Sequence, residues 1–317
     1  MKKHIWAITY TIVLIAFTVY MALDTFVITR IYSVVEDENK TSIDEKLQDD
    51  ENTTSENETK QESSEDYTDV PKETVISDMS YSDENISINI TEYREYNSSI
   101  YVADIKVSDP DYLKTAFALD SFGKNATEKT SAIAERNDAI LAINGDYYGA
   151  QERGYVLRNG SLYRETASRN REDLVIYEDG SFDIITEGEV LAEDLLNDGA
   201  VQILSFGPAL VDDGNIVITE DDEVDKAMTS NPRTAIGIVD ELHYMFIVSD
   251  GRTDESEGLS LYELAEFSLK FGVKTLYNLD GGGSSTMYFN GEIINNPTSG
   301  RNRIKERSVS DIVFIGY

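Results

Sequence analysis

One stretch, residues 276–288, constrains the fold of this chain more than any other. An apolar run ends at Asp280, a glycine- and serine-rich turn follows, and a second apolar run begins near Thr286. This order predicts a strand that stops at Asp280, a turn of bare backbone and a second strand. Because glycine lacks a Cβ atom, a ligand can approach such a turn closely, and its N–H groups and hydroxyls suit an anion. A plain hairpin turn is the alternative. The five candidate anion-binding residues are Gly281, Gly282, Gly283, Ser284 and Ser285.

Short apolar segments separated by turn signals make up most of residues 85–317. Period-two alternation, as in Ile86–Ile90, predicts strands with one exposed face. The continuous apolar run 139–143 predicts a strand that is buried on both faces. Further strands are expected at residues 100–107, 113–119, 154–160, 174–177, 182–185, 206–211, 233–239, 244–248, 273–280 and 312–315.

Three helices are expected among these strands. The first covers residues 127–137, with Thr127 and Thr130 as candidate N-caps. The second covers residues 190–196. The third follows Ser260, which with Glu263 has the spacing of a capping box. Many strands and few helices predict an α+β fold: mixed β-sheets with a few flanking helices in a single domain.

The N-terminal part of the chain predicts a membrane anchor and a stalk. Lys2 and Lys3 precede an uncharged apolar run at residues 5–23, close to the length that crosses a bilayer. Residues 1–35 are therefore expected to be a single-pass transmembrane anchor with a cytoplasmic N-terminus and the domain outside the cell. Cleavage as a signal peptide, which would secrete the domain, is the alternative. The acidic, polar residues 36–84 predict a disordered stalk, and the folded domain is expected at residues 85–317.

Composition excludes several classes of site. The formal net charge of −33 argues against a nucleic-acid partner, because phosphate backbones require clustered Lys and Arg. The chain has no cysteine, so disulfides, thiolate metal sites and cysteine nucleophiles are excluded. Its two histidines are His4, beside the anchor, and His243, inside a predicted strand. Acid–base chemistry therefore falls to carboxylates.

Carboxylates and guanidiniums recur where the apolar runs begin or end. Asp146, Asp250 and Asp280 each follow such a run, Arg252 lies beside Asp250, and Arg233 begins another run. If these strands share one sheet, the side chains gather at one edge, although each Asp-Gly pair alone is typical of a turn. Arginine suits a phosphate because its planar fork makes paired hydrogen bonds. Further candidates lie in the loop before the last strand: Arg301, Arg303 and Arg307.

Six blocks, in order, resemble the phosphodiester glycosidase family. They are Asn144-Gly-Asp-Tyr-Tyr, Phe206-Gly-Pro-Ala-Leu-Val, Asn231-Pro-Arg-Thr-Ala-Ile-Gly, Asp250-Gly-Arg with Gly258-Leu-Ser-Leu-Tyr-Glu-Leu-Ala, Asn278-Leu-Asp-Gly-Gly-Gly-Ser-Ser-Thr-Met and Glu306-Arg-Ser-Val. The resemblance is strongest over residues 139–317 and extends to bacterial relatives labelled exopolysaccharide-biosynthesis proteins. Two features depart from the family. The first block has Gly-Asp-Tyr-Tyr where many relatives have Gly-Gly-Tyr-Phe, and the absence of cysteine differs from the disulfide-bearing animal enzyme.

The resemblance implies a hydrolase that cleaves the bond between a sugar C1 and the oxygen of a phosphodiester in a cell-surface glycan. Asp280 or Asp250 is expected to act as base or nucleophile, and Asp146 is a further catalytic candidate. The phosphate is expected on Arg233, Arg252 and the 281–285 backbone, with Arg307 nearby. Asn144 and Asn278 are expected to position sugar hydroxyls.

Three other interpretations fit the same residues. No cofactor is required for the expected chemistry, but three aspartates can also bind Ca²⁺ or Mg²⁺ through hard oxygen ligands: Asp146, Asp250 and Asp280. A non-catalytic surface glycan-binding module is the main alternative function. A lytic enzyme that cuts ordinary glycosidic bonds is the third.

Overall fold

The structure is a computed structural model that describes residues 5–35, 74–222 and 230–317. Within these ranges the chain forms β-sheets with few helices, so the predicted α+β fold class is confirmed. Every ladder between named strands in these ranges is antiparallel. The α-helices there are α1 (Ile5–Phe26), α3 (Thr130–Arg136), α4 (Ala192–Asn197) and α5 (Leu261–Leu269).

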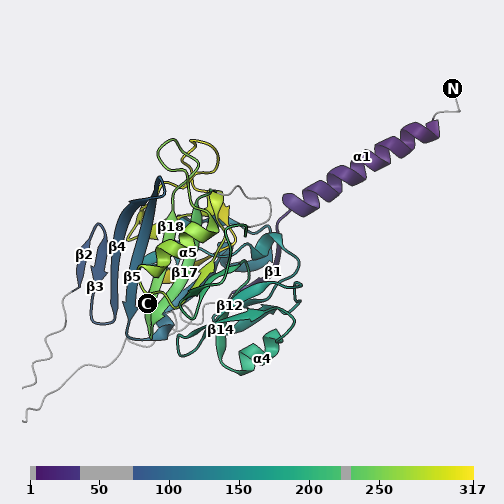
Figure 1. Ribbon diagram of the computed structural model, residues 1–317. Helices are drawn as coiled ribbons and strands as arrows, with labels where there is room; N and C mark the ends of the chain where they lie inside the picture. The colour runs from purple at the N-terminus through teal and green to yellow at the C-terminus, as the bar shows by residue number, and fades with distance from the viewer. Residues whose placement is uncertain (1–4, 36–73, 223–229) are drawn as a thin grey trace, which may run out of the picture.

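The largest sheet has nine strands, and its first strands can be followed in Figure 1 from the left edge of the domain toward its centre. Its strands are ordered β16 (Asn215–Ile216), β15 (Ala209–Asp212), β19 (Thr275–Asn278), β17 (Arg233–Asp240), β18 (His243–Ser249), β5 (Ser98–Val107), β4 (Ile86–Glu95), β3 (Ser80–Ser82) and β2 (Val75–Ser77). The sheet therefore begins at Val75, ten residues before the predicted domain boundary, because β3 pairs with β4 and β2 pairs with β3. Most of the predicted stalk, residues 36–73, lies outside the described residues.

Two further five-stranded sheets complete the domain. The second sheet is ordered β21 (Glu292–Ile293), β20 (Met287–Phe289), β9 (Leu141–Asn144), β23 (Asp311–Ile315) and β6 (Leu113–Phe117). The third is ordered β11 (Ser161–Arg164), β10 (Val156–Arg158), β14 (Ala200–Leu204), β12 (Glu172–Tyr177) and β13 (Phe182–Thr186). Two small ladders join β1 (Arg30–Val34) to β7 (Ser121–Lys124) and β22 (Ser308–Val309) to β8 (Glu128–Lys129).

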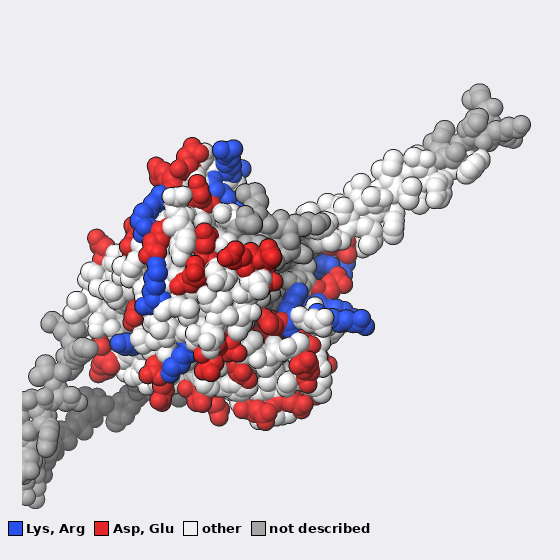
Figure 2. Space-filling model, viewed as in Figure 1, with Lys and Arg blue, Asp and Glu red and all other residues white. Residues whose placement is uncertain are grey.

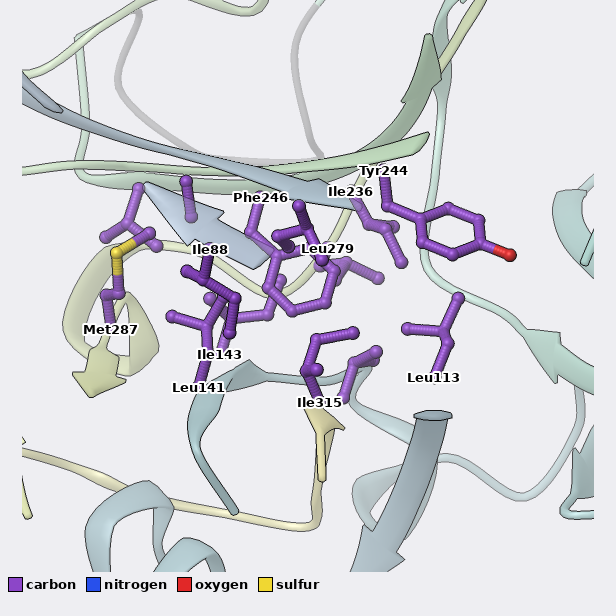
Figure 3. Packing of buried hydrophobic residues seen from close by; sticks show 14 of the residues in the cluster. Ile88, Leu113, Leu141, Ile143, Ile236, Tyr244, Phe246, Leu279, Met287 and Ile315 are labelled. Carbon is purple, nitrogen blue, oxygen red and sulfur yellow. The ribbon is translucent and has the colours of Figure 1, made fainter. Parts of the chain in front are cut away.

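The first two sheets pack face to face over the main core (Figure 3). Ile236 and Phe246 of the large sheet meet Leu141, Ile143 and Ile315 of the second sheet in one buried cluster. Alternate residues of the large sheet face α5 instead. The order across the domain is thus α5, large sheet, second sheet and α3, with the third sheet packed on α4.

Two local predictions are confirmed in detail. The run at 139–143 lies between two cores: Leu141 and Ile143 face the main core, whereas Ala142 packs on the side of α3. The capping box of α5 is present, because the Ser260 hydroxyl accepts from the Glu263 N–H at 3.1 Å and the Glu263 carboxylate accepts from the Ser260 N–H at 2.8 Å.

Other boundaries differ from the predictions for physical reasons. Helix α3 begins at Thr130 after Lys129, and neither Thr127 nor Thr130 caps it, because residues 128–129 continue as a strand paired with β22. Strand β6 ends at Phe117, since Leu119 turns with a φ of +57°. The predicted strand at 154–160 retains only Val156–Arg158, and the predicted helix at 190–196 begins two residues later.

Candidate active site

The triple-glycine loop lies at one end of the large sheet, where β19 stops beside the start of β17. The Leu279 N–H donates to the Thr234 carbonyl at 2.9 Å, and the Gly282 N–H donates to the Pro232 carbonyl at 2.8 Å. Residues 282–284 then form one 3-10 turn before β20 begins at Met287. The loop is thus fixed on both sides, and Asp280 stands at the sheet edge as predicted.

The Asp280 carboxylate has two partners from the surrounding loops. Its Oδ2 accepts from the Ser284 hydroxyl at 2.5 Å and from Arg307 Nη2 at 3.1 Å. The side chain is 13 % exposed. Burial raises the pKa of Asp280, and the hydrogen bonds and charge of Arg307 and Ser284 oppose that shift. The result is a largely desolvated carboxylate held by a guanidinium that is itself 45 % exposed.

Arg252 approaches the same loop from the other side. Its φ is +61°, and its Nε and Nη2 both donate to the Asn231 side-chain oxygen, at 3.1 and 2.8 Å. Burial and the charge of Arg307 lower the pKa of Arg252, whereas the charge of Asp280 raises it. The positive charges of Arg252 and Arg307 are therefore close enough to repel each other, and the negative charge of Asp280 attracts Arg252.

Glycine suits position 282 of this loop because the Arg252 guanidinium lies against its backbone. A Cβ atom on Gly282 would lie 2.8 Å from Arg252 Nη2, and Gly282 has a φ of +60°. A Cβ atom on Gly283 would lie 3.4 Å from Arg307 Cδ. A side chain at Gly282 would therefore displace the Arg252 guanidinium, whereas at Gly283 the tightest neighbour is Ser299 Cα at 3.2 Å. The absence of a side chain at Gly282 thus lets the Arg252 guanidinium lie close to the loop backbone.

Arg233 and Asp250 lie at the same end of the sheet, but their side chains have other partners. Arg233 pairs with Ser249 in the ladder, and a Cβ atom on Gly281 would lie 3.8 Å from its Cα. The predicted gathering of Arg233, Asp250 and Asp280 at one edge therefore holds for the backbone. Arg233 Nε nevertheless donates to the Leu259 carbonyl at 2.9 Å, and the side chain is buried.

The Asp250 carboxylate holds the loop at residues 295–296. It accepts from the Asn296 N–H at 2.8 Å and from the side-chain amides of Asn295 and Asn296 at 3.1 and 3.2 Å. Burial raises the pKa of Asp250, and these three hydrogen bonds oppose the shift. We therefore infer that Asp250 has a structural role and fixes the loop at residues 295–296 through these hydrogen bonds.

Asn144 and Asn278 are buried and bonded to backbone. Asn144 Nδ2 donates to the Asp280 carbonyl at 2.5 Å, while its Oδ1 accepts from the Thr234 hydroxyl at 2.8 Å. Asn144 thereby connects strand β9 of the second sheet to the backbone of Asp280 and to Thr234 of the large sheet. Asn278 Nδ2 donates to the Gly207 carbonyl at 2.8 Å, and its Oδ1, like the Ser285 hydroxyl, is buried without a hydrogen-bond partner among the described residues.

Asp146 does not join Asp280, contrary to the predicted cluster of three aspartates. Its Oδ2 accepts from Arg158 Nη2 at 2.8 Å and from the Ser205 N–H at 2.9 Å, and its Oδ1 accepts from the Tyr148 N–H at 2.8 Å. Arg158 also binds Asp311 at 2.7 Å, and all three side chains are buried. The Asp146 charge is therefore used in a buried ion network.

The predicted cation ligands are consequently not assembled. Across residues 5–35, 74–222 and 230–317, no three His, Cys, Asp or Glu side chains are placed to hold one metal ion. Among the loop arginines, Arg307 docks on Ser284 and Asp280, whereas Arg301 and Arg303 are exposed.

Arg158 and Asp311 were not predicted to take part in this region. Arg158 precedes an Asn-Gly pair and resembles a turn flank, and Asp311 begins the last strand. The two residues are 153 positions apart in the sequence, yet Arg158 Nη2 donates to Asp311 Oδ2 at 2.7 Å. No local sequence pattern indicates this contact. The buried pair Asp173 and Glu187 was missed for the same reason.

Comparison with known proteins identifies the family. The sequence profile of the phosphodiester glycosidases matches residues 137–316, which include Asp280, Arg252 and Arg307. The chain belongs to the phosphodiester glycosidase family. The match omits α1, the strands β1–β8 and helix α3. In this family member, β5 adds to the site from outside the match, since the Asp250 N–H donates to the Ser99 carbonyl at 3.0 Å.

Relatives in animals and bacteria share the domain. N-acetylglucosamine-1-phosphodiester alpha-N-acetylglucosaminidase of Mus musculus is 28 % identical over 215 residues, which cover 61 % of this chain and 40 % of the relative. The SPbeta prophage-derived uncharacterized protein YomE of Bacillus subtilis is 29 % identical over 201 residues, which cover 62 % of this chain and 31 % of the relative. The chain thus spans less than half the length of the curated relatives it matches.

A solved structure supports the likeness of fold. The catalytic domain of zebrafish N-acetylglucosamine-1-phosphodiester alpha-N-acetylglucosaminidase, auto-inhibited by its pro-peptide, superposes with a TM-score of 0.57 and 23 % identity. The match covers 73 % of this chain and 83 % of that chain. At this identity the likeness concerns the fold alone.

Proposed function

We propose that this protein hydrolyses the C1–O bond of a sugar 1-phosphodiester in an extracytoplasmic glycan and releases the sugar and a phosphate monoester. Family membership supports the reaction class. The observation that carries the proposal is the Asp280 carboxylate, bonded to Arg307 and flanked by Arg252 across a glycine backbone. This arrangement offers one carboxylate for the sugar and two guanidiniums for the phosphate.

The chemistry fits these groups. The departing phosphate monoester has a second pKa near 6, so it needs less proton donation than an alcohol leaving group. Arg252 and Arg307 stabilise the charge that develops on the phosphate oxygen as the C1–O bond breaks. Asp280 acts at C1, either by taking the proton of an attacking water or as the nucleophile. Burial, which raises its pKa, makes the carboxylate a stronger base.

Other candidate residues have supporting roles in this proposal. Asn144 fixes the Asp280 backbone, and Asp250 fixes the loop at 295–296. Among the described residues, three buried polar atoms near the loop have no hydrogen-bond partner and are candidates to meet the substrate: Asn278 Oδ1 and the hydroxyls of Ser285 and Thr286. We propose that no divalent cation is required, because two guanidiniums supply the positive charge. Complete loss of turnover in EDTA, restored by Ca²⁺ or Mg²⁺, would contradict this part.

The experiment measures phosphate monoester release from the methyl phosphodiester of N-acetylglucosamine 1-phosphate, the linkage named in the curated relatives. We expect Asp280→Asn and Arg307→Met each to lower turnover about 10²- to 10³-fold. The matched control is Asp254→Asn, an exposed aspartate near Arg252, which should leave turnover unchanged. Near-wild-type turnover by both site variants rejects the proposal. Binding without turnover in the wild type supports a glycan-binding module instead, and equal turnover of a phosphate-free glycoside supports a lytic enzyme.

We further propose that α1 anchors the domain in the cell membrane. Its 22 residues at about 1.5 Å each span roughly the hydrocarbon core. One 18-residue window, Thr9–Phe26, is apolar enough to cross a membrane by length and composition, as a signal sequence would also be. The space-filling view shows no charged side chain on the part of this helix that is drawn in white and extends away from the domain (Figure 2). Lys2 and Lys3 favour a cytoplasmic N-terminus.

A further inference from the structure

An aromatic cavity lies apart from the Asp280 loop, where strand β1 docks beside β7. Its volume is about 360 Å³. Four of its lining residues are aromatic: Tyr32, Phe122, Tyr148 and Tyr163. The Phe122 and Tyr148 rings stack at 5.4 Å with 17° between their planes, and Tyr163 lies 5.3 Å from Phe122. These contacts give the cavity a wall of rigid ring faces.

Two cations also line this cavity. Arg164 donates through Nε to the Gly154 carbonyl at 2.6 Å and through Nη1 to the Gln151 carbonyl at 2.7 Å. Its Nη2 is buried and has no hydrogen-bond partner in the described parts of the chain. No carboxylate of those parts lies within ion-pair distance of Arg164 either. The second cation, Lys124, pairs at 2.8 Å with Glu152, whose side chain is 80 % exposed.

Among the described residues, the Arg164 guanidinium has no carboxylate partner and its Nη2 has no acceptor, and this group beside aromatic faces defines a ligand chemistry. A buried donor without an acceptor costs free energy, which an entering anionic oxygen restores. Aromatic walls with a few polar groups are typical of small-molecule sites, and a cavity near the lower end of their usual range of roughly 300–1,000 Å³ suits one compact ligand. Hydroxyl groups of that ligand can reach Gln151 and Lys124, which line the same space.

We infer that this cavity is a second binding site, which takes a single sugar unit bearing a phosphate or carboxylate group. The ring packs on the aromatic wall, and the anionic group binds Arg164 and Lys124. None of the cavity's lining residues belongs to the Asp280 site. The site therefore binds a charged unit of a glycan independently of hydrolysis. It also explains the local role of Asp146, which holds the Tyr148 N–H and hence the wall of the cavity.

The test uses the full chain in detergent micelles, with Asp280→Asn, Arg252→Met and Arg307→Met introduced together so that the catalytic site neither binds nor turns over the probe. Titration calorimetry with α-D-glucose 1-phosphate should then detect one remaining site. Adding Arg164→Met should weaken that binding about tenfold or more, the size expected for a lost charged hydrogen bond. Lys124→Met should also weaken it, and since Lys124 has only a surface partner, this variant keeps the fold. The matched control is Arg153→Met, an exposed arginine.

Four results overturn the inference. They are the absence of binding in the Asp280→Asn/Arg252→Met/Arg307→Met protein, unchanged binding in both Arg164→Met and Lys124→Met, equal affinity for inorganic phosphate and glucose 1-phosphate, and binding of phosphatidylglycerol vesicles without binding of the sugar phosphate. The third result indicates a simple anion site, and the fourth a lipid headgroup site. Because the catalytic residues are already replaced, failure here is distinguishable from failure of the proposed hydrolysis.

Discussion

At the scale of single residues, the site depends on how Arg307 and Asp280 share their charge. Arg307 stabilises the ionised carboxylate, and burial opposes ionisation. When a phosphate arrives, Arg307 can bind it only by sharing its donors, which leaves Asp280 with less stabilisation and greater basicity. The same guanidinium therefore links phosphate binding to activation of the carboxylate.

This coupling predicts a change in the pH profile. If the ionised Asp280 carboxylate is the active form, kcat/KM falls as the pH decreases through its raised pKa. Arg307→Met removes a charge that lowers this pKa, so the acidic limb should move to higher pH, while turnover falls about 10²- to 10³-fold. Arg307→Lys should move the limb less. The exposed Arg303 is the control: Arg303→Met should leave the limb in place, and an unmoved limb in Arg307→Met would assign the titration to another group.

A second prediction concerns stability and the buried pair Asp173 and Glu187. Burial, and then the Glu187 carboxylate, raise the pKa of Asp173 well above its usual range. Between its usual and raised pKa values the folded chain binds a proton that the unfolded chain has lost, so the free energy of unfolding falls as pH rises through that window. Asp173→Asn cannot ionise. We expect it to flatten this slope and to be more stable than the wild type at pH 8.

Urea unfolding at several pH values between 4 and 8 measures that slope. Asp183→Asn is the matched control, because Asp183 is exposed on the neighbouring strand β13. It should reproduce the wild-type slope. A slope that persists in Asp173→Asn would mean that other groups produce it.

At the scale of elements, buried polar side chains join the sheets to one another. Arg158 of β10 connects Asp146, after β9, with Asp311 of β23, so it fixes the third sheet to the second. Asn144 likewise connects β9 with β17 through Thr234. Asn144 also donates to the Asp280 carbonyl, so this side chain connects the Asp280 loop to both sheets.

Removing the central cation of this network should be costly. Arg158→Met leaves Asp146 and Asp311 buried without their counter-charge, and we expect a loss of about 3–5 kcal/mol in the free energy of unfolding. Arg136→Met is the comparison, because Arg136 pairs with Asp120 and Glu128 but is 27 % exposed, and such pairs contribute about 0–1 kcal/mol. Guanidinium chloride unfolding of both variants gives the two values. Similar small losses would show that the buried network stabilises the fold little.

Local patterns predicted the elements better than they predicted the contacts. The alternation at Ile86–Ile90, the double-sided run at 139–143 and the capping box of α5 each depend on residues a few positions apart. The partners of Asp146 and Asp250 depend instead on how distant strands align. An Asp-Gly pair looks the same whether the carboxylate faces a substrate or a buried arginine, so the sequence could place the acids at sheet ends without separating their roles.

At the scale of the whole molecule, helix α1 and the domain are joined by strand β1, which pairs with the domain. Strand β1 begins four residues after α1 ends, and it pairs with β7, where a Cβ atom on Gly123 would lie 2.3 Å from the Arg30 carbonyl. Tyr32 packs on Phe122 at 5.8 Å. The buried clusters of the domain, however, all lie between Ile86 and Ile315. The hydrophobic core therefore does not depend on residues 5–35. The position of the domain relative to α1, in contrast, depends on the pairing of β1 with β7.

This division predicts what removal of residues 1–73 will do. The shortened chain should remain in solution after high-speed centrifugation, fold cooperatively and keep the turnover of the full chain on a soluble phosphodiester. The full chain should sediment with membranes, and its intact mass should include Lys2 and Lys3, because an uncleaved anchor keeps them. Ala substitution of Tyr32 in the full chain is the control for β1: it should alter the aromatic cavity and not membrane association. A full chain that is recovered from the medium, with a mass lacking the apolar run, would show instead that α1 serves as a signal peptide and that the domain acts as a secreted protein.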